Sequence, residues 1–231
     1  MLHRSWPNVV RWLLVVAIPP LLVAIALRVV TSPWIVHWEY NRPGFPPDPY
    51  GLSLTERTQL ASVCVEYLRT DADIDLLAAL NLPDGTPAFN ERELSHMADV
   101  QHVLRQLLIV GDIAGAFVLL GGAILFVRRA TRQLLAVASL NGSLLIAALL
   151  VGIGIYMSVD WNGFFTAFHR VCFHGDSWLF AYSDTLIRLF PIPFWVDVAI
   201  ALVGIVGVGA LVLGVGGYVW YRRLRRYPAP V

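Results

Sequence analysis

Four long apolar stretches alternate with polar segments along the chain. They cover residues 9–30, 107–127, 134–157 and 196–220, and as helices each could cross about 30 Å of hydrocarbon. The two long segments between them, 31–106 and 158–195, are polar or rich in aromatic residues. This pattern predicts an all-α membrane protein with four transmembrane helices and a mainly helical extracytoplasmic cap formed by the loops 31–106 and 158–195.

The distribution of charge predicts the orientation. Three clusters of arginine next to the spans contain no acidic residue: Arg4 with Arg11, Arg128 with Arg129 and Arg132, and Arg222 with Arg223, Arg225 and Arg226. The two loops hold fourteen of the sixteen Asp and Glu residues. Because an excess of positive charge stays in the cytoplasm, we expect both termini there and both loops on the extracytoplasmic side of the membrane.

Composition narrows the chemistry. The chain is 57% hydrophobic with a formal net charge of +1, so we expect membrane lipid and no nucleic acid as a partner. All seventeen basic residues are arginine, which excludes lysine as a base or Schiff-base former. Base chemistry is therefore left to histidine or a carboxylate.

The first span is open to two interpretations. Ala24-Ile25-Ala26 resembles the cleavage site of a secretory signal. The apolar run, however, is longer than the usual core of a signal peptide, and Pro19-Pro20 would kink rather than end a helix inside a bundle. These features favour an uncleaved anchor.

The first loop carries two helix starts. After aromatic residues expected at the membrane interface, four prolines and a glycine in 41–49 forbid a helix. Ser53 with Glu56 forms a capping box that predicts a helix over about 53–69. Asn90 with Glu93 forms a second cap, and no breaker follows before the second span, so one helix is expected to run from the loop into that span.

Helical continuity places His96 relative to the membrane. Seven residues separate it from Val103, where the unbroken apolar character begins, and seven residues of helix rise about 10 Å. The headgroup layer is only about 5–7 Å thick on each side. His96 is therefore expected near the outer edge of the headgroups, close to the ester bonds of a lipid.

The second loop places another imidazole among aromatic residues. If 162–173 is helical, Phe165, His169 and Phe173 share one face at i, i+4 and i+8. The density of aromatic residues is typical of a segment that lies in the interface or covers the bundle. His169 is then either functional or a buried histidine satisfied by one backbone carbonyl.

Several kinds of site are disfavoured. No HExxH is present, and His96 and His102 are six residues apart, which turns them away from each other on a helix, so we expect no metal and no cofactor. No GxSxG or comparable nucleophile motif occurs. Asp112 and Asp197, near the outer ends of two spans, could form an aspartyl pair, but a structural role is favoured.

The two cysteines leave two alternatives. Cys64 and Cys172 fall one in each loop, where a disulfide would tie the loops together. The other alternative, slightly favoured, is that each is a small apolar residue on a buried helix face.

The order and spacing of short motifs resemble the bacterial lipoprotein intramolecular transacylase family. The resemblance rests on Glu93-Leu-Ser-His96-Met97-Ala-Asp99-Val100 before a span, then Phe168-His169, Trp178, Asp184-Thr-Leu-Ile187 and Phe190-Pro191, together with Glu39-Tyr40-Asn41, Tyr50-Gly51 and Tyr67-Leu68. It covers most of the chain and agrees with the four-span layout. No single motif is diagnostic.

The resemblance implies an acyltransferase. Enzymes of that family move the sn-2 acyl chain of a diacylglyceryl-cysteine to the α-amino group of the same cysteine and yield a lyso-form lipoprotein. The expected partner is then a diacylated bacterial lipoprotein, and donor and acceptor on one molecule need no acyl-enzyme. The attack does need a base, because an α-amino group with a pKa of about 8 is largely protonated at neutral pH.

The resemblance assigns the catalytic imidazoles to His96 and His169, with His96 as general base and His169 as its partner. Asp99 and Glu93 lie within one turn of His96, and Asp99 either raises its basicity or caps a solvated face. Further candidates for contact with the oxyanion or headgroup are Arg170, Tyr182, Asp184 and Arg28. Two rival hypotheses are a non-catalytic membrane subunit that binds a lipid or partner, and bis-histidine haem ligation.

Overall fold

The computed structural model describes residues 5–173, 175 and 177–226 and divides the chain into two compact units. The bundle unit takes its described residues from 1–27, 107–159 and 202–231. The polar unit consists of 28–106 and 160–201. The described residues form helices, and their one pair in β-bridge geometry is Asn81 with Pro87.

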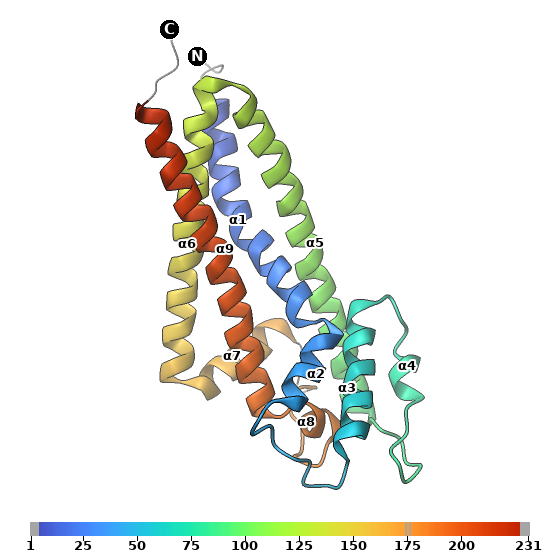
Figure 1. Cartoon of the computed structure of the whole chain (residues 1–231). Coiled ribbons are helices and arrows are strands. Elements are labelled where there is room, and N and C mark those ends of the chain that lie inside the picture. The colour runs from blue at the N-terminus through green and yellow to red at the C-terminus, as the bar shows by residue number, and fades with distance from the viewer. Residues whose placement is uncertain (1–4, 174, 176, 227–231) are drawn as a thin grey trace. The chain divides into compact units, whose positions relative to one another are not determined.

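Four helices are long and apolar enough to cross a membrane: α1 (Trp6–Val30), α5 (Glu91–Val127), α6 (Arg132–Val159) and α9 (Ile192–Arg226). Each predicted span lies inside one of them. Their bundle parts run alongside one another in Figure 1, and a short 3-10 helix, η2 (Arg129–Thr131), leads from α5 into α6. The chain is therefore an all-helical, multi-pass membrane protein.

Close approach of small residues holds the bundle unit together. Ile18, Leu22 and Ala26 of α1 pack with residues of α6 and α9 in one buried cluster. A Cβ added to Gly142 would lie 2.6 Å from Ile18, and one added to Gly111 would lie 2.0 Å from the Cβ of Ala24. Glycine at these two positions lets the helix backbones come closer than any side chain would allow.

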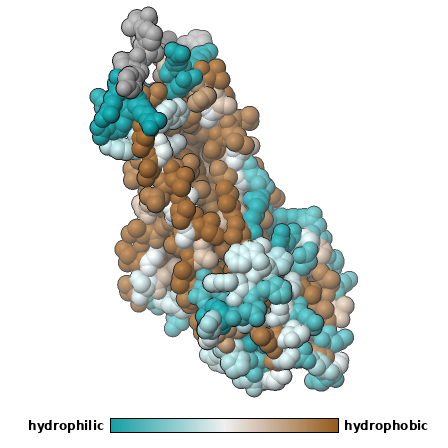
Figure 2. Space-filling view, viewed as in Figure 1, coloured by the Kyte–Doolittle hydropathy of each residue, from teal (hydrophilic) through white to brown (hydrophobic). Residues whose placement is uncertain are grey.

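The outward side chains of the bundle helices are apolar. Leu119, Val151 and Val208 are each more than half exposed, and brown side chains cover these helices in Figure 2. In water such a surface would drive aggregation, whereas lipid covers it without cost. The surface is what a membrane-embedded bundle requires.

The polar unit is built from shorter helices around its own core. They are α2 (Pro33–Asn41), α3 (Leu54–Arg69), α4 (Asp75–Ala78), α7 (Trp161–Cys172) and α8 (Thr185–Leu189), together with the flanking ends of α1, α5 and α9. Ile35, Tyr67 and Leu189 are among the fully buried members of the core. Residues from both loops of the sequence thus share one hydrophobic cluster.

The two predicted helix starts in the first loop are confirmed. The Ser53 hydroxyl accepts a hydrogen bond from the Glu56 backbone N–H (3.3 Å), and the Glu56 side chain accepts one from the Ser53 N–H (2.7 Å). Asn90 and Glu93 make the same reciprocal pair at the start of α5. The single helix predicted to run from the loop into the second span is α5.

The sequence analysis missed α2, which was expected only as aromatic residues at the interface. Ser32 has the extended backbone of a residue that precedes a helix, and Pro33 occupies the first turn, where its missing N–H costs nothing. This Ser-Pro pair was the available signal. The segment after α2, Arg42 to Ser53, contains no helix, as its prolines predicted.

An acidic residue of α2 is buried without full compensation. Glu39 has no exposed surface, and one of its oxygens accepts a hydrogen bond from Arg42 Nε (2.7 Å), while Arg42 also pairs with Asp197. Burial raises the pKa of Glu39, although the Arg42 bond opposes the shift. Asp197 is thus part of an ion-pair group within the polar unit.

Candidate active site

His96 lies in the second turn of α5, within the polar unit. It is 9% exposed, and Phe173 and Phe180 present ring edges to it at centroid distances of 4.9 and 5.2 Å. Its Nδ1 is buried and has no hydrogen-bond partner among the described residues. Because burial disfavours an uncompensated positive charge, we expect a neutral imidazole here.

His169 lies near the end of α7, a helix capped by Asp160, whose Oδ1 accepts a hydrogen bond from Gly163 N (2.8 Å). The predicted face is present, because the rings of Phe165 and Phe173 lie against His169 at 4.0 and 5.4 Å between centroids. His169 Nδ1 lies 2.8 Å from the Phe165 carbonyl oxygen. A carbonyl can only accept, so Nδ1 carries the proton and Nε2 keeps a free lone pair.

The environment of His169 favours its neutral form. Burial lowers the pKa of His169 below the usual 6.5, and the hydrogen bond to the Phe165 carbonyl opposes part of this shift. Trp178 lies 5.0 Å from the imidazole, centroid to centroid. An imidazole that is neutral at neutral pH can accept a proton.

The two imidazoles face each other. Their centroids are 6.2 Å apart and their planes differ by 18°. The helices α5 and α7 therefore bring together two histidines that are 73 positions apart in the sequence, with aromatic rings around both. Two neutral imidazoles in an apolar surrounding can hold, accept and donate protons at one place.

Two of the predicted supporting residues position other parts of the unit. Glu93 is 2% exposed, and its Oε1 accepts a hydrogen bond from the Leu186 N–H (2.7 Å) at the start of α8. Asp99, one turn after His96, accepts a hydrogen bond from the Ser177 hydroxyl (3.3 Å), and Ser177 directly precedes the ring-stacking Trp178. Each carboxylate therefore ties the helix of His96 to the segment after α7.

The remaining supporting residues lie elsewhere. Asp184 pairs with Arg92 (2.8 Å) and accepts a hydrogen bond from the Ala181 N–H (2.8 Å), which fixes the turn before α8. Tyr182 is 81% exposed, Arg170 is also exposed, and Arg28 lies in the last turn of α1. Among the described residues, neither Arg170 nor Tyr182 forms a ring contact or hydrogen bond with the two imidazoles.

Both cysteines are free thiols, so the structure contains no disulfide between them. Cys64 has no exposed surface and belongs to the core of the polar unit, and burial raises the pKa of its thiol. Cys172, at the end of α7, is partly exposed. Cys64 thus fits the second of the two alternatives, a small apolar residue on a buried helix face.

Sequence reasoning missed Ser177 and the buried Arg57. A single serine beside a tryptophan carries no recognisable signal, because its partner Asp99 is 78 residues away. Arg57 lies inside an otherwise amphipathic helix and reads as a solvated position. Within the part of the chain that the structure describes, no three His, Cys, Asp or Glu side chains gather as metal ligands.

The sequence matches the family model of the lipoprotein intramolecular transacylase Lit over residues 11–195. The chain belongs to the Lit family. This Lit family member of 231 residues is also similar to a protein of Aquifex aeolicus (strain VF5), which is described only as an uncharacterized protein. The two are 31% identical over 191 residues, which are 80% of this chain and 82% of the relative.

The fold of this Lit family member is that of a solved relative. The membrane integral lipoprotein intramolecular transacylase Lit from Bacillus cereus superposes with a TM-score of 0.82 and 20% identity, covering 96% of this chain and 99% of that one. Two further structures of the Bacillus protein, each with one histidine replaced by arginine or alanine, give TM-scores of 0.76 and 0.77. The family is one of acyltransferases that act on lipoproteins.

Proposed function

We propose that this protein is a lipoprotein intramolecular transacylase that moves the sn-2 acyl chain of a diacylglyceryl-cysteine to the α-amino group of the same cysteine. Family membership supports the reaction class. The observation that carries the mechanism is the facing pair of imidazoles, His96 and His169, 6.2 Å apart among aromatic rings. Helix arithmetic along α5 supports a place for this pair near the ester bonds of a membrane lipid.

In the proposed reaction a new bond forms between the cysteine nitrogen and the acyl carbonyl carbon, and the ester bond to the sn-2 oxygen breaks. The amine loses one proton and the leaving glyceryl oxygen gains one. Because both groups belong to one substrate, proximity and orientation can supply about 7–11 kcal/mol of the barrier. No covalent enzyme intermediate is needed.

The tautomer of His169 changes the assignment of the proton acceptor. The sequence analysis gave the general-base role to His96, but the hydrogen bond from His169 Nδ1 to Phe165 leaves Nε2 of His169 ready to accept the amine proton. We assign His169 as general base and later proton donor to the leaving oxygen. His96, neutral and held by Phe173 and Phe180, would donate its N–H to the oxyanion of the tetrahedral intermediate.

Aromatic rings around both imidazoles would exclude water. In such a place the deprotonated amine attacks the ester, and hydrolysis of the ester by water is suppressed.

We place the site on the extracytoplasmic face and both termini in the cytoplasm. The support is that the described arginines of the three clusters lie near the start of α1, at the α5–α6 connection and at the end of α9, and these three places lie together at one end of the bundle in Figure 1.

Mass spectrometry of a reporter lipoprotein's N-terminal peptide, made in a bacterium that lacks the activity, tests the function. We expect N-acyl, S-monoacylglyceryl product with the native protein and a loss of about 10²–10⁴-fold with His169→Gln, because an amide cannot accept the proton. His102→Ala, at an exposed histidine of α5 outside the facing pair, is the control. Absence of product with the native protein would favour a non-catalytic, lipid-binding membrane protein.

The two roles are separable. His96→Gln retains an N–H donor and should keep more activity than His96→Ala, whereas His169→Gln should be as inactive as His169→Ala. The reverse ranking would make His96 the base. Retention of the variants in the membrane and unchanged thermal unfolding in detergent would show that the loss is not a folding defect.

A further inference from the structure

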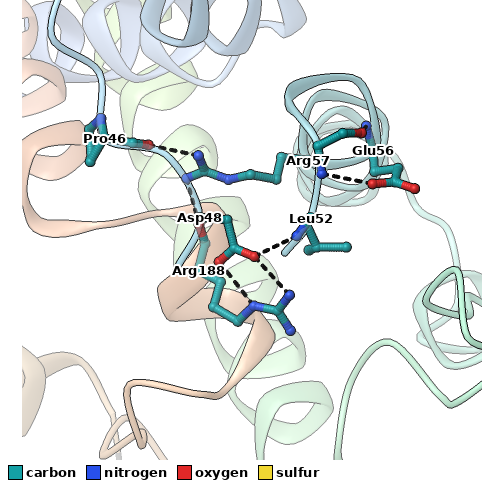
Figure 3. A network of polar contacts seen from close by, with 7 residues as sticks. Pro46, Asp48, Leu52, Glu56, Arg57 and Arg188 are labelled. Atoms are coloured by element: carbon teal, nitrogen blue, oxygen red, sulfur yellow. Dashed lines mark hydrogen bonds and ion pairs between the residues drawn. The ribbon is translucent and has the colours of Figure 1, made fainter. Parts of the chain in front are cut away.

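A buried arginine of α3 has no opposite charge beside it. Arg57 is 2% exposed, and its guanidinium donates to the Pro46 carbonyl (2.8 Å) and to the Arg188 carbonyl (2.7 Å), the first of which is drawn in Figure 3. Among the described residues no carboxylate forms an ion pair with it, and its Nε has no hydrogen-bond partner. A guanidinium has five N–H donors, so most of its capacity is unused.

The other neighbours of Arg57 hold it in place without neutralising it. The guanidinium carbon lies 5.1 Å from the ring centroid of Tyr40 and 5.2 Å from that of Phe45. Cation–π contacts of this kind orient a guanidinium but carry no full negative charge. A buried charge without a counter-charge is destabilising unless a ligand supplies one.

Arg57 lines a crevice of about 280 Å³, here called the Arg57 crevice, together with Tyr40, residues 45–48, Leu52 and Leu54. Asp48 is the acidic group of that lining, and it is committed elsewhere. Its two oxygens accept hydrogen bonds from Arg188 (3.1 and 2.9 Å) and from the Leu52 N–H (2.8 Å), as Figure 3 shows. Two guanidinium groups and one carboxylate leave one uncompensated positive charge.

The position of the crevice along the polar unit indicates where the anion would come from. Arg188, whose backbone carbonyl accepts a hydrogen bond from Arg57, belongs to α8. The first turn of α8 in turn donates a hydrogen bond to Glu93 of α5, from the Leu186 N–H. Glu93 precedes Val103 by ten residues, a rise of about 15 Å. This level is about 5 Å farther from the hydrocarbon than His96, on the side where the polypeptide of a lipid-anchored substrate leaves the membrane.

We propose that the Arg57 crevice binds an acidic side chain in the polypeptide that follows the lipidated cysteine of the substrate. The inference rests on the proposed function, because that function supplies a ligand with acyl chains in the membrane and a polypeptide leaving on the water side. The guanidinium would donate charge-assisted hydrogen bonds to the carboxylate. The crevice would thereby select among lipoproteins by the charge near their modified end.

A binding measurement tests the crevice without turnover. The full-length protein in nanodiscs of neutral phospholipid is titrated with two fluorescent diacylglyceryl lipopeptides whose tethers differ only in Glu or Gln. We expect the Glu peptide to bind about tenfold more tightly, the effect of one charge-assisted hydrogen bond. Equal dissociation constants would overturn the proposal.

Two matched variants locate the effect. Leu54→Glu adds a resident carboxylate to the crevice lining and should abolish the preference for the Glu peptide, whereas Thr55→Glu adds the same charge at an exposed neighbouring position outside the lining. Arg57→Gln should also abolish it. If the Arg57 variant does not fold, the Leu54 and Thr55 pair decides, and a preference unchanged in Leu54→Glu overturns the proposal.

Two further arms identify the source of the anion and separate this proposal from the proposed function. Nanodiscs with anionic phosphatidylglycerol, or inorganic phosphate at about 10 mM and matched ionic strength, should leave the Glu-to-Gln ratio within about twofold, because a carboxylate tethered to the bound lipopeptide has a far higher effective concentration at the crevice than either competitor. Loss of the ratio in either arm would make phosphate the ligand and overturn the proposal. A native protein that prefers the Glu peptide but forms no N-acyl product would refute the transacylase alone.

Discussion

The two units are held together by different forces. In the bundle unit, helices meet through glycine and alanine at contacts such as Gly111 with Ala24, and apolar side chains fill the space between them. In the polar unit, side-chain hydrogen bonds join segments far apart in the sequence, such as Glu93 with Leu186 and Tyr40 with Leu189 (2.6 Å). The bundle therefore tolerates almost any apolar outer surface, whereas the polar unit depends on a few buried polar groups.

This difference matters for function because both imidazoles belong to the polar unit. His96 is placed by the helix that Glu93 caps, and His169 by a helix whose cap is Asp160. A lesion in the bundle should remove the whole protein, while a lesion in the polar network should disturb the site and leave the spans in place. The following predictions test that separation, beginning with the largest effect.

Gly111→Ala should strongly destabilise the bundle. The new Cβ would lie 2.0 Å from the Cβ of Ala24 and 3.3 Å from the Pro20 carbonyl oxygen, and such overpacking costs about 3 kcal/mol. Thermal unfolding in detergent measures the loss. Gly152→Ala, with nothing within 4 Å, is the control and should be neutral or slightly stabilising. The double variant with Ala24→Gly should recover part of the loss, and no recovery would mean that the contact is not what limits stability.

Glu93→Ala should loosen α8 and leave the bundle intact. It leaves the backbone N–H groups of Leu186 and Asn90 without acceptors, at a cost of about 2 kcal/mol. Hydrogen exchange should become faster in 185–189 and unchanged in the bundle part of α5. Glu93→Gln keeps one acceptor, so its exchange rate in 185–189 should lie between those of the native protein and Glu93→Ala. Glu66→Ala, at an exposed position of α3, should leave that rate unchanged. Unaltered exchange in α8 would refute the positioning role.

Acid should weaken the polar unit through His169. An unfolded histidine takes up a proton near pH 6.5, whereas burial lowers the pKa of the folded ring, so below 6.5 the unfolded chain binds more protons and folding becomes less favourable. The loss should begin near pH 6.5 and continue until the folded ring is protonated. Hydrogen exchange of 161–172 at pH 7.5, 6.5 and 5.5 measures it.

His169→Gln removes one of two titrating rings and should make this pH profile less steep, whereas His37→Gln, at an exposed position of α2, should leave it unchanged. His96 faces His169 and supplies whatever dependence on pH remains in the variant. A profile identical in the native protein and His169→Gln would show that this imidazole is not held in its neutral form.

The same contrast explains how far the sequence could predict the structure. The spans follow from the length of apolar runs, and α3 and the start of α5 follow from capping boxes, because these signals act within a few residues. His96 and His169 were singled out by the resemblance to the transacylase family, and each lies on a helix that the sequence predicted. The long-range contacts of Arg57 with Arg188, of Glu93 with Leu186 and of Asp99 with Ser177 were not predictable, since dozens of residues separate each pair and only the folded chain brings them together.

Tyr182→Phe should have almost no effect, although the sequence analysis named Tyr182 as a candidate for contact with the oxyanion or headgroup. Its side chain is 81% exposed, and among the described residues it forms no hydrogen bond. Exposed substitutions of this kind change stability by less than about 0.5 kcal/mol, and activity should stay within about twofold of the native protein. Mass spectrometry of the reporter's N-terminal peptide measures the activity. Tyr218→Phe in α9 is a control that removes a tyrosine hydroxyl from the bundle unit. A tenfold loss in Tyr182→Phe alone would mean that the hydroxyl reaches the substrate, and that the exposed segment after Trp178 closes over the imidazoles during the reaction.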